Sequence, residues 1–385
     1  MPGCGRGVIR GDRFSNPGSL AERELIMAIH DTPNLLDLPG IRVPIIQAPM
    51  AGVSSPAMAA AVADSGGLGS LGFGAMIAAE ARKAIQQFRE LSAGPLNANV
   101  FVHRPAQADR ARESAWLERL RPQFEQWGAS APAQLQEPYR SFLVDDDMLG
   151  MLVEEKPAVV SFHFGLPHRH QIDALHDAGI VLLATATNLA EAAAIEAAGI
   201  DAIVAQGYEA GGHRGMFDPD IEDSRLGTLA LTRMLAQTTS VPVIAAGGIM
   251  DGAGIAAALA LGARAAQLGT AFIATDESLA DAGYRERLFS DAAHHTTMTR
   301  VISGRQARSL ESAFTRWGAG VPDGSVPDYP IAYDAGKALN RAGKAAGQTG
   351  YGAHWAGQGA PLARALSTRA LMQALDAELV EALKC

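Results

Sequence analysis

The stretch Asp201-Ala-Ile-Val-Ala-Gln-Gly-Tyr-Glu-Ala-Gly-Gly-His-Arg-Gly215 joins an apolar run to a loop with four glycines and one histidine. Residues 201–205 predict a buried strand, and the polar Gln206 follows its carboxyl end. Glycine lets a backbone approach a ligand closely, and a histidine such as His213 can hold or move a proton near neutral pH. The stretch therefore predicts a strand that ends in a ligand site.

Two later stretches repeat this arrangement. They are Val241-Pro-Val-Ile-Ala-Ala-Gly-Gly-Ile249 and Ala265-Ala-Gln-Leu-Gly-Thr-Ala271. Three apolar strands that each end in glycine predict a cofactor site built by a repeated strand–helix fold.

Short apolar strands alternate with alanine-rich helical stretches along most of the chain. The predicted strands are 44–49, 67–71, 97–102, 157–163, 180–185, 201–205, 241–245 and 264–268. The predicted helices are 55–65, 76–92, 168–178, 188–198, 226–238, one after Asp251, and helical sequence from strand eight to about residue 290. The strands are nearly continuous apolar runs, as expected when both faces are buried. Eight such units predict an α/β fold, a (β/α)8 TIM barrel with a C-terminal helical cap segment; an open doubly wound sheet is the alternative.

The expected domain organisation has three parts. Residues 1–33 form a loose N-terminal extension, with Met27 as an alternative start; 34–295 form the barrel, in which 104–153 contains helices and an insertion; 296–385 form the cap segment and a packing helix. Within the cap segment we expect helices near 307–317 and 330–346, and a final helix over 361–384.

Composition narrows the class of protein. Hydrophobic residues make up 48% of the chain and charged residues 19%, which allows a large core, and the net charge of −9 argues against general nucleic-acid binding. Every apolar run is broken before the roughly 18 residues that a membrane span needs. Cys4 and Cys385 offer neither metal-ligand spacing nor a disulfide framework, so we expect a cytoplasmic protein. The oligomeric state is left open, a homo-oligomer included.

The loops after strands seven and eight predict a phosphate site. Barrels often bind phosphate there, and the backbone amides of Gly247 and Gly248 can point at phosphate oxygens, as helix N-termini do. Thr270, after Gly269, can add a hydroxyl donor. A single Gly-Gly pair would more simply make a tight turn, but two such loops in register favour phosphate.

FMN fits this phosphate site best. The chain has no P-loop and no dinucleotide fingerprint after its first strand. Asn99 and Gln206 are amides that can match the donors and acceptors at a flavin ring edge. Ala48, Pro49 and Met50 can lie against the ring, with core packing as the alternative for Met50.

Five ordered motifs resemble the nitronate monooxygenases, formerly called 2-nitropropane dioxygenases. They are Gln47-Ala-Pro-Met-Ala-Gly52, Ser161-Phe-His-Phe-Gly165, Glu209-Ala-Gly-Gly-His-Arg-Gly215, Ala246-Gly-Gly-Ile249 and Gln267-Leu-Gly-Thr270. The resemblance covers about residues 40 to 345. It implies a TIM barrel containing FMN that oxidises alkyl nitronates, such as propionate 3-nitronate, with O2 to a carbonyl compound and nitrite.

The resemblance also implies roles for individual residues. The residues expected at FMN are Asn99, Gln206, Gly211, Gly212, Gly247, Gly248, Gln267, Leu268, Gly269 and Thr270. His213 is the expected catalytic residue, and His163 is expected to line the substrate side. Tyr329, Tyr333 and Lys337 match a Tyr-x3-Tyr-x3-Lys pattern that closes the pocket, and their spacing predicts one helix face.

These residue types suit a nitronate, which is a delocalised anion. His213 and Lys337 can supply positive charge or hydrogen bonds to its oxygens, and a neutral His213 can take the α-proton of a nitroalkane. We expect no metal, because His168, His170 and His176 lack a carboxylate or cysteine partner. The run Asp145-Asp-Asp147 predicts a helix cap or a turn and not a cation site. The alternatives are an NAD(P)H-dependent flavin reductase acting on quinones or an enoyl thioester, and a non-catalytic flavin-binding module.

Overall fold

Eight parallel strands form the centre of the protein. The computed structural model describes residues 38–384, so the expected N-terminal extension (1–33), Cys4 and Cys385 lie outside the described residues. The strands are β1 (Ile45–Gln47), β2 (Gly69–Gly72), β3 (Leu96–Phe101), β4 (Val159–His163), β5 (Val181–Ala186), β6 (Ala202–Gln206), β8 (Val243–Ala246) and β9 (Ala265–Leu268). All eight lie where the sequence predicts them.

The sheet closes on itself. Its order is β1-β9-β8-β6-β5-β4-β3-β2, and the two end strands meet through a parallel bridge between Ile46 and Leu68. The Leu68 amide donates to the Ile45 carbonyl at 3.0 Å, and the Gln47 amide donates to the Leu68 carbonyl at 3.0 Å. The fold is therefore a (β/α)8 TIM barrel and not the open doubly wound sheet.

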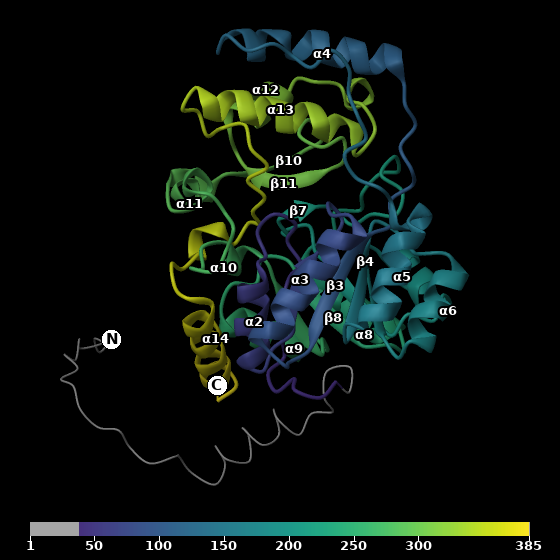
Figure 1. Cartoon of the computed structure of the whole chain (residues 1–385). Coiled ribbons are helices and arrows are strands. Elements are labelled where there is room, and N and C mark those ends of the chain that lie inside the picture. Colours follow the sequence, from purple (N-terminus) through teal and green to yellow (C-terminus); the bar gives the residue numbers. More distant parts are fainter. Residues whose placement is uncertain (1–37, 385) are drawn as a thin grey trace, which may run out of the picture.

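Helices surround the barrel (Figure 1). They are α2 (Pro56–Asp64), α3 (Ala78–Leu91), α5 (Asp146–Glu155), α6 (Arg169–Asp177), α7 (Leu189–Ala197), α8 (Thr228–Thr238), α9 (Gly252–Ala260) and α14 (Thr368–Ala382). Capping residues fix where several of these helices begin. The side chains of Ser55, Asp145 and Asn188 accept hydrogen bonds from backbone amides in the first turns of α2, α5 and α7.

The eighth barrel helix is not the one expected after strand eight. The segment to residue 290 forms only the short helices α10 (Thr270–Ile273) and α11 (Ala282–Leu288). Helix α14 packs between α9 and α2 instead, because its buried residues Leu371, Leu375 and Leu379 fill that position in the core. It begins at Thr368, capped by Ser367, and not near 361 as expected.

A cap covers the carboxyl ends of the strands. It contains α4 (Arg110–Glu125), α12 (Ala313–Gly318), α13 (Ile331–Ala345) and a small sheet of β10 (Thr296–Thr299), β11 (Ala307–Leu310) and β7 (Gly212–His213). Helix α4 comes from the insertion after β3, yet its residues Trp116, Leu120 and Phe124 share one core with cap residues such as Phe314 and Leu339. The cap is therefore built from two separate segments of chain (Figure 1).

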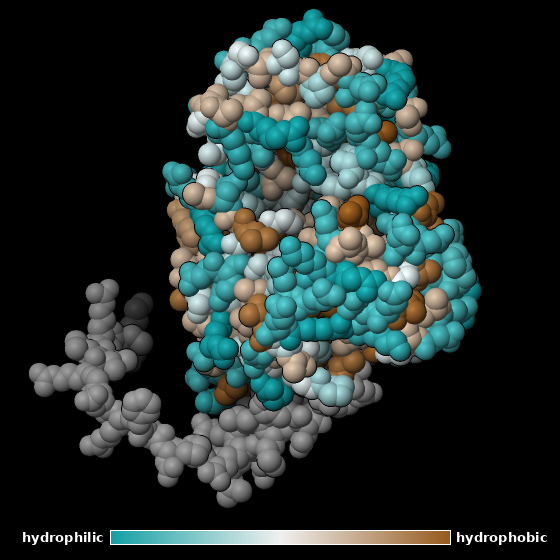
Figure 2. All heavy atoms as spheres, viewed as in Figure 1, coloured by the Kyte–Doolittle hydropathy of each residue, from teal (hydrophilic) through white to brown (hydrophobic). Residues whose placement is uncertain are grey.

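One cap element differs from its predicted type. Residues 307–310 were expected to be helical but form β11, because they pair with both β10 and β7. Helix α12 starts only at Ala313, after the capping residue Ser312. On the face in Figure 2, hydrophobic residues gather at the height where the cap meets the barrel.

None of the helices between residues 38 and 384 has the length and apolar character of a membrane span.

Candidate active site

His213 lies where the barrel and the cap meet. It belongs to β7, which pairs with β11 of the cap, so that His213 is opposite Ala307. From the barrel side, the Gln206 side chain donates to the His213 carbonyl at 2.9 Å and accepts from the Gly215 amide at 2.8 Å. The loop singled out in the sequence is therefore held from both sides.

The His213 imidazole is hydrogen-bonded and neutral. Its Nε2 lies 2.9 Å from Ser303 Oγ, and the Ser303 hydroxyl donates to the Arg305 carbonyl at 3.2 Å. Burial, followed by His163, Arg305 and His103, lowers the pKa of His213 well below its ordinary value. The ring can therefore accept a proton but carries no charge of its own at neutral pH.

Aromatic rings enclose this imidazole. The ring centroids of Phe164, Tyr329, Tyr333 and Trp355 lie 5.5, 5.3, 6.3 and 5.1 Å from that of His213. Burial raises the pKa of Tyr333 to about 12 and also raises the pKa of Tyr329. Both phenols are therefore neutral donors beside the histidine.

His163 supports the loop that carries His213. Its Nδ1 lies 3.1 Å from Thr185 Oγ1 and its Nε2 lies 3.2 Å from the His213 carbonyl. Burial lowers the pKa of His163 to about 4. Both ring nitrogens are engaged by the protein, so His163 lies behind His213 and acts on its backbone.

Tyr329, Tyr333 and Lys337 come together, but not on one helix face. Helix α13 starts at Ile331, so Tyr329 precedes it and the prediction is wrong for that residue. The reason is Pro330, because a residue before proline is disfavoured in the helical conformation. Lys337 Nζ lies 4.3 Å from the centre of the Tyr139 ring and 5.4 Å from that of Tyr333. Burial lowers the pKa of Lys337.

The glycines after β8 leave backbone donors free. Gly247 and Gly248 have φ of +124° and +72°, where a side chain would be strained. A Cβ on Gly247 would lie 2.8 Å from Thr228 Oγ1, so the tight packing also requires glycine there. No described residue accepts a hydrogen bond from the amides of Gly247, Gly248, Gly269 or Thr270. The neighbouring ends of β8 and β9 thus offer four donors to an anion.

A strap formed by residues 355–359 closes over these loops. The Gly357 amide donates to Thr270 Oγ1 at 3.0 Å, and the Gln358 amide donates to the Glu209 carbonyl at 2.9 Å. A Cβ on Gly211 would lie 2.5 Å from the Gly357 amide nitrogen. Gly211 is therefore needed for contact with the strap, which the sequence did not reveal.

The ends of β1 and β9 also meet at this level. A Cβ on Gly269 would lie 3.4 Å from Ala48 Cβ and 3.7 Å from Met50 Sδ. The side chain of Leu268 does not face the site: it lies in the core between the sheet and the helices, and only its backbone is available. Asn99 Nδ2 donates to the carbonyl and the hydroxyl of Ser161, both at 3.0 Å.

The structure adds residues that the sequence reasoning missed. His103 is 1% exposed, its ring nitrogens have no partner among the described residues, and its ring centre lies 5.0 Å from that of Tyr329. Burial lowers the pKa of His103 to about 3. Its position directly after strand three was the one available signal, whereas Ser303 and Arg305 belong to no motif.

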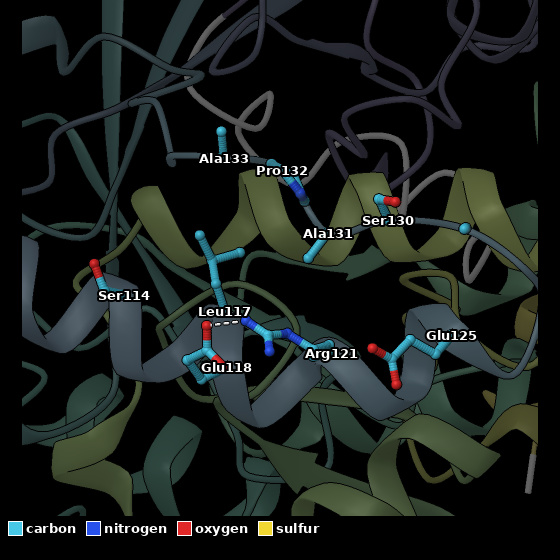
Figure 3. A pocket seen from close by; sticks show the side chains of 10 residues that line it. Ser114, Leu117, Glu118, Arg121, Glu125, Ser130, Ala131, Pro132 and Ala133 are labelled. Carbon is cyan, nitrogen blue, oxygen red and sulfur yellow. Dashed lines mark hydrogen bonds and ion pairs between the residues drawn. The ribbon is translucent and has the colours of Figure 1, made fainter.

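The described residues contain no group of three metal-ligating side chains. A groove lies on α4, lined by Ser114, Leu117, Glu118, Arg121, Glu125 and residues 129–133, with an ion pair between Glu118 and Arg121 (Figure 3). None of its residues belongs to the site around His213, and α4 lies on the side of the cap away from the barrel (Figure 1).

The fold and this site define a barrel enzyme whose chemistry takes place at the carboxyl ends of the strands. A family model described as nitronate monooxygenase matches residues 32–378. Two proteins named nitronate monooxygenase, from Paraburkholderia phytofirmans and Pseudomonas aeruginosa, are 63% and 53% identical to this chain. The alignments cover 91% and 88% of this chain and 96% and 97% of those proteins.

Two solved structures resemble this chain in fold. A nitroalkane oxidase from Streptomyces ansochromogenes superimposes with a TM-score of 0.83 at 41% identity, over 91% of this chain and 99% of that one. FabK from Thermotoga maritima has a TM-score of 0.68 at 29% identity, over 91% and 96% of the two chains. The chain belongs to the nitronate monooxygenase family. It is a flavin-dependent oxidoreductase that oxidises nitronates.

Proposed function

We propose that the flavin is FMN and that its phosphate binds to the backbone amides at the ends of β8 and β9. The observation that carries this proposal is the set of unused amides on Gly247, Gly248, Gly269 and Thr270. Backbone N–H groups in such turns bind phosphate without a basic side chain. The Thr270 hydroxyl accepts from the strap and still has its proton to donate to a phosphate oxygen.

The remaining flavin contacts follow from the same rim of the barrel. Ala48, Pro49 and Met50 would lie against the ring, beside Gly269. Groups at the ends of other strands would surround the flavin: Asn99, Gln206, Gln267 and the backbone of Leu268. The loop after β6 would contribute Gly211 and Gly212. Bound FMN would supply the electron transfer between substrate and O2, which is chemistry that no side chain supplies.

His213 is the proposed catalytic residue. Its neutral imidazole can hydrogen-bond a nitronate oxygen or take the α-proton of a bound nitroalkane. Lys337 supplies the positive charge that a delocalised anion requires, and Tyr329 and Tyr333 enclose the substrate with their phenols. His163, also expected at the substrate, contributes by holding the His213 backbone.

The proposed substrates are alkyl nitronates, with propionate 3-nitronate as the expected physiological one, and the products are a carbonyl compound and nitrite. The aromatic rings around His213 exclude water from the reacting atoms. The proposed compartment is the cytoplasm, in keeping with the lack of any disulfide framework in the sequence.

The absorption spectrum of the purified protein tests this function. We expect a yellow protein whose extracted cofactor is FMN, and whose flavin band falls when a nitronate is added without oxygen. Air should restore the band with release of nitrite. Bleaching by NADH but not by a nitronate would favour a flavin reductase, and bound flavin that responds to neither would favour a binding module.

A further inference from the structure

Arg305 is a buried cation whose nearest carboxylate charges act from a distance: Glu191 and Asp220 favour its charged form without pairing with it. Arg305 is 4% exposed, and its guanidinium forms no ion pair with any described carboxylate. Its guanidinium donates to the Met216 carbonyl, while its buried Nε has no partner. Burying an arginine in this way is costly, so its position calls for an explanation beyond packing.

The position of Arg305 connects it to the catalytic histidine. Its Cζ lies 4.3 Å from the centre of the Phe164 ring, and that ring meets His213 edge-on at 5.5 Å. Two residues earlier in the same turn, Ser303 holds Nε2 of His213 at 2.9 Å. Gly304, with φ of +93°, lets this turn pack closely against the Pro327 carbonyl.

We propose that Arg305 is a positioning residue: from behind Phe164 its fixed charge adds to burial in disfavouring a protonated His213 imidazole, while Ser303 keeps the single ring proton on Nε2. The Ser303 hydroxyl donates its own proton to the Arg305 carbonyl. It can therefore only accept a hydrogen bond from Nε2 of His213, and Nδ1 is left as the unprotonated nitrogen. This proposal rests on the catalytic role proposed for His213.

The other groups around His213 do not replace this charge. His163 and His103 are neutral because burial lowers their pKa values to about 4 and about 3. The phenols of Tyr329 and Tyr333 are neutral because burial raises their pKa values.

Two further cations lie near His213. Arg214 is neutralised by Asp223, which lies 2.8 Å from its Nε. Lys337 reaches the histidine only through the Tyr333 ring. Arg305 itself keeps its charge: its pKa of about 10, lowered by burial, still lies well above neutral pH.

The test is histidine-selective ¹⁵N NMR of the flavin-loaded protein, with His213 assigned by its absence in His213→Asn. In the unmodified protein we expect a neutral ring with the proton on Nε2 at neutral pH, and a titration midpoint well below the ordinary value of 6.5. Arg305→Met should raise the titration midpoint by roughly one pH unit, as expected when a fixed charge leaves a partly buried neighbour. Arg305→Lys should leave the midpoint near that of the unmodified protein, and Ser303→Ala should let the proton occupy Nδ1.

Several results would overturn the proposal. One is a His213 in the unmodified protein that titrates at its ordinary value or carries its proton on Nδ1, a measurement that needs no variant to fold. Another is an equal midpoint in Arg305→Met and the unmodified protein. Failure of the proposed function has a different signature, because His213→Asn would then keep its nitronate turnover whatever the NMR shows.

Discussion

At the scale of single residues, His213 carries the proposed catalytic role. It is half-buried, neutral, hydrogen-bonded to Ser303 and surrounded by four aromatic rings. We expect His213→Asn to retain flavin and fold but to lose about 100-fold or more in nitronate turnover, the range for removing a positioned acid–base group. Nitrite release under saturating substrate measures this. His170→Asn, on the exposed outer helix α6, is the control and should be unchanged.

Lys337 gives a prediction about pH. Burial lowers the pKa of its ammonium, so the charge that attracts the nitronate is fully present at neutral pH and is lost as the pH rises through a value below the ordinary 10.5. We expect the KM of the unmodified protein to rise in that alkaline range. Lys337→Met should have a KM raised about tenfold at neutral pH, and Lys337→Arg should stay closer to normal. A KM that is the same in the Met variant at every pH would exclude Lys337 from substrate binding.

The sequence predicts roles for His213 and Lys337 because they lie in motifs, but no motif points to Arg305, Ser303 or His103. These three lie at the site through contacts with residues far away in the chain: Ser303 meets His213 across 90 positions. A single sequence carries no periodicity or local spacing that reports such a contact.

At the scale of elements, the loop after β8 links backbone conformation to cofactor binding. A side chain on Gly247 would be strained at φ +124° and would press on Thr228. We expect Gly247→Ala to weaken flavin binding at least about tenfold, equivalent to about 1.4 kcal/mol, measured by flavin release on dilution. Gly150→Ala is the matched control, because that helical glycine has open space around it; it should keep its flavin and gain up to about 1 kcal/mol in stability.

Helix α14 is a structural part of the barrel, despite its place at the end of the sequence. Leu375 is fully buried against the layer shared with α9 and α2. Leu375→Ala should lower the free energy of unfolding by about 2–5 kcal/mol, as for other buried leucines, in urea denaturation. Gln373→Ala, on the exposed face of the same helix, should change it by less than about 0.5 kcal/mol. Equal effects would mean that α14 does not complete the ring.

Elements with strong local patterns were predictable. The eight strands are apolar runs because helices cover one face and the barrel interior the other, and residues such as Asn188 cap the helices that follow. Elements defined by distant partners were not predictable: β11 exists because β7 and β10 flank it, and α14 takes the eighth helical position because α2 and α9 leave it open.

At the scale of the whole molecule, both the barrel and the cap contribute residues to the candidate site. The barrel supplies the glycine loops, and the cap supplies Ser303, Arg305, Tyr329 and Lys337. The link between them is β7, a two-residue strand that belongs to a barrel loop and pairs with the cap sheet. The sequence indicated a cap but not its composition from two segments, because only the packing of α4 on α13 reveals it.

A crystal structure of the flavin-loaded protein would show directly which groups hold the flavin phosphate. We expect FMN at the carboxyl ends of the strands, with phosphate oxygens accepting from the amides of Gly247, Gly248, Gly269 and Thr270, and the flavin ring between Met50 and His213. A flavin bound elsewhere, or a phosphate held by other groups while these amides stay unused, would contradict it.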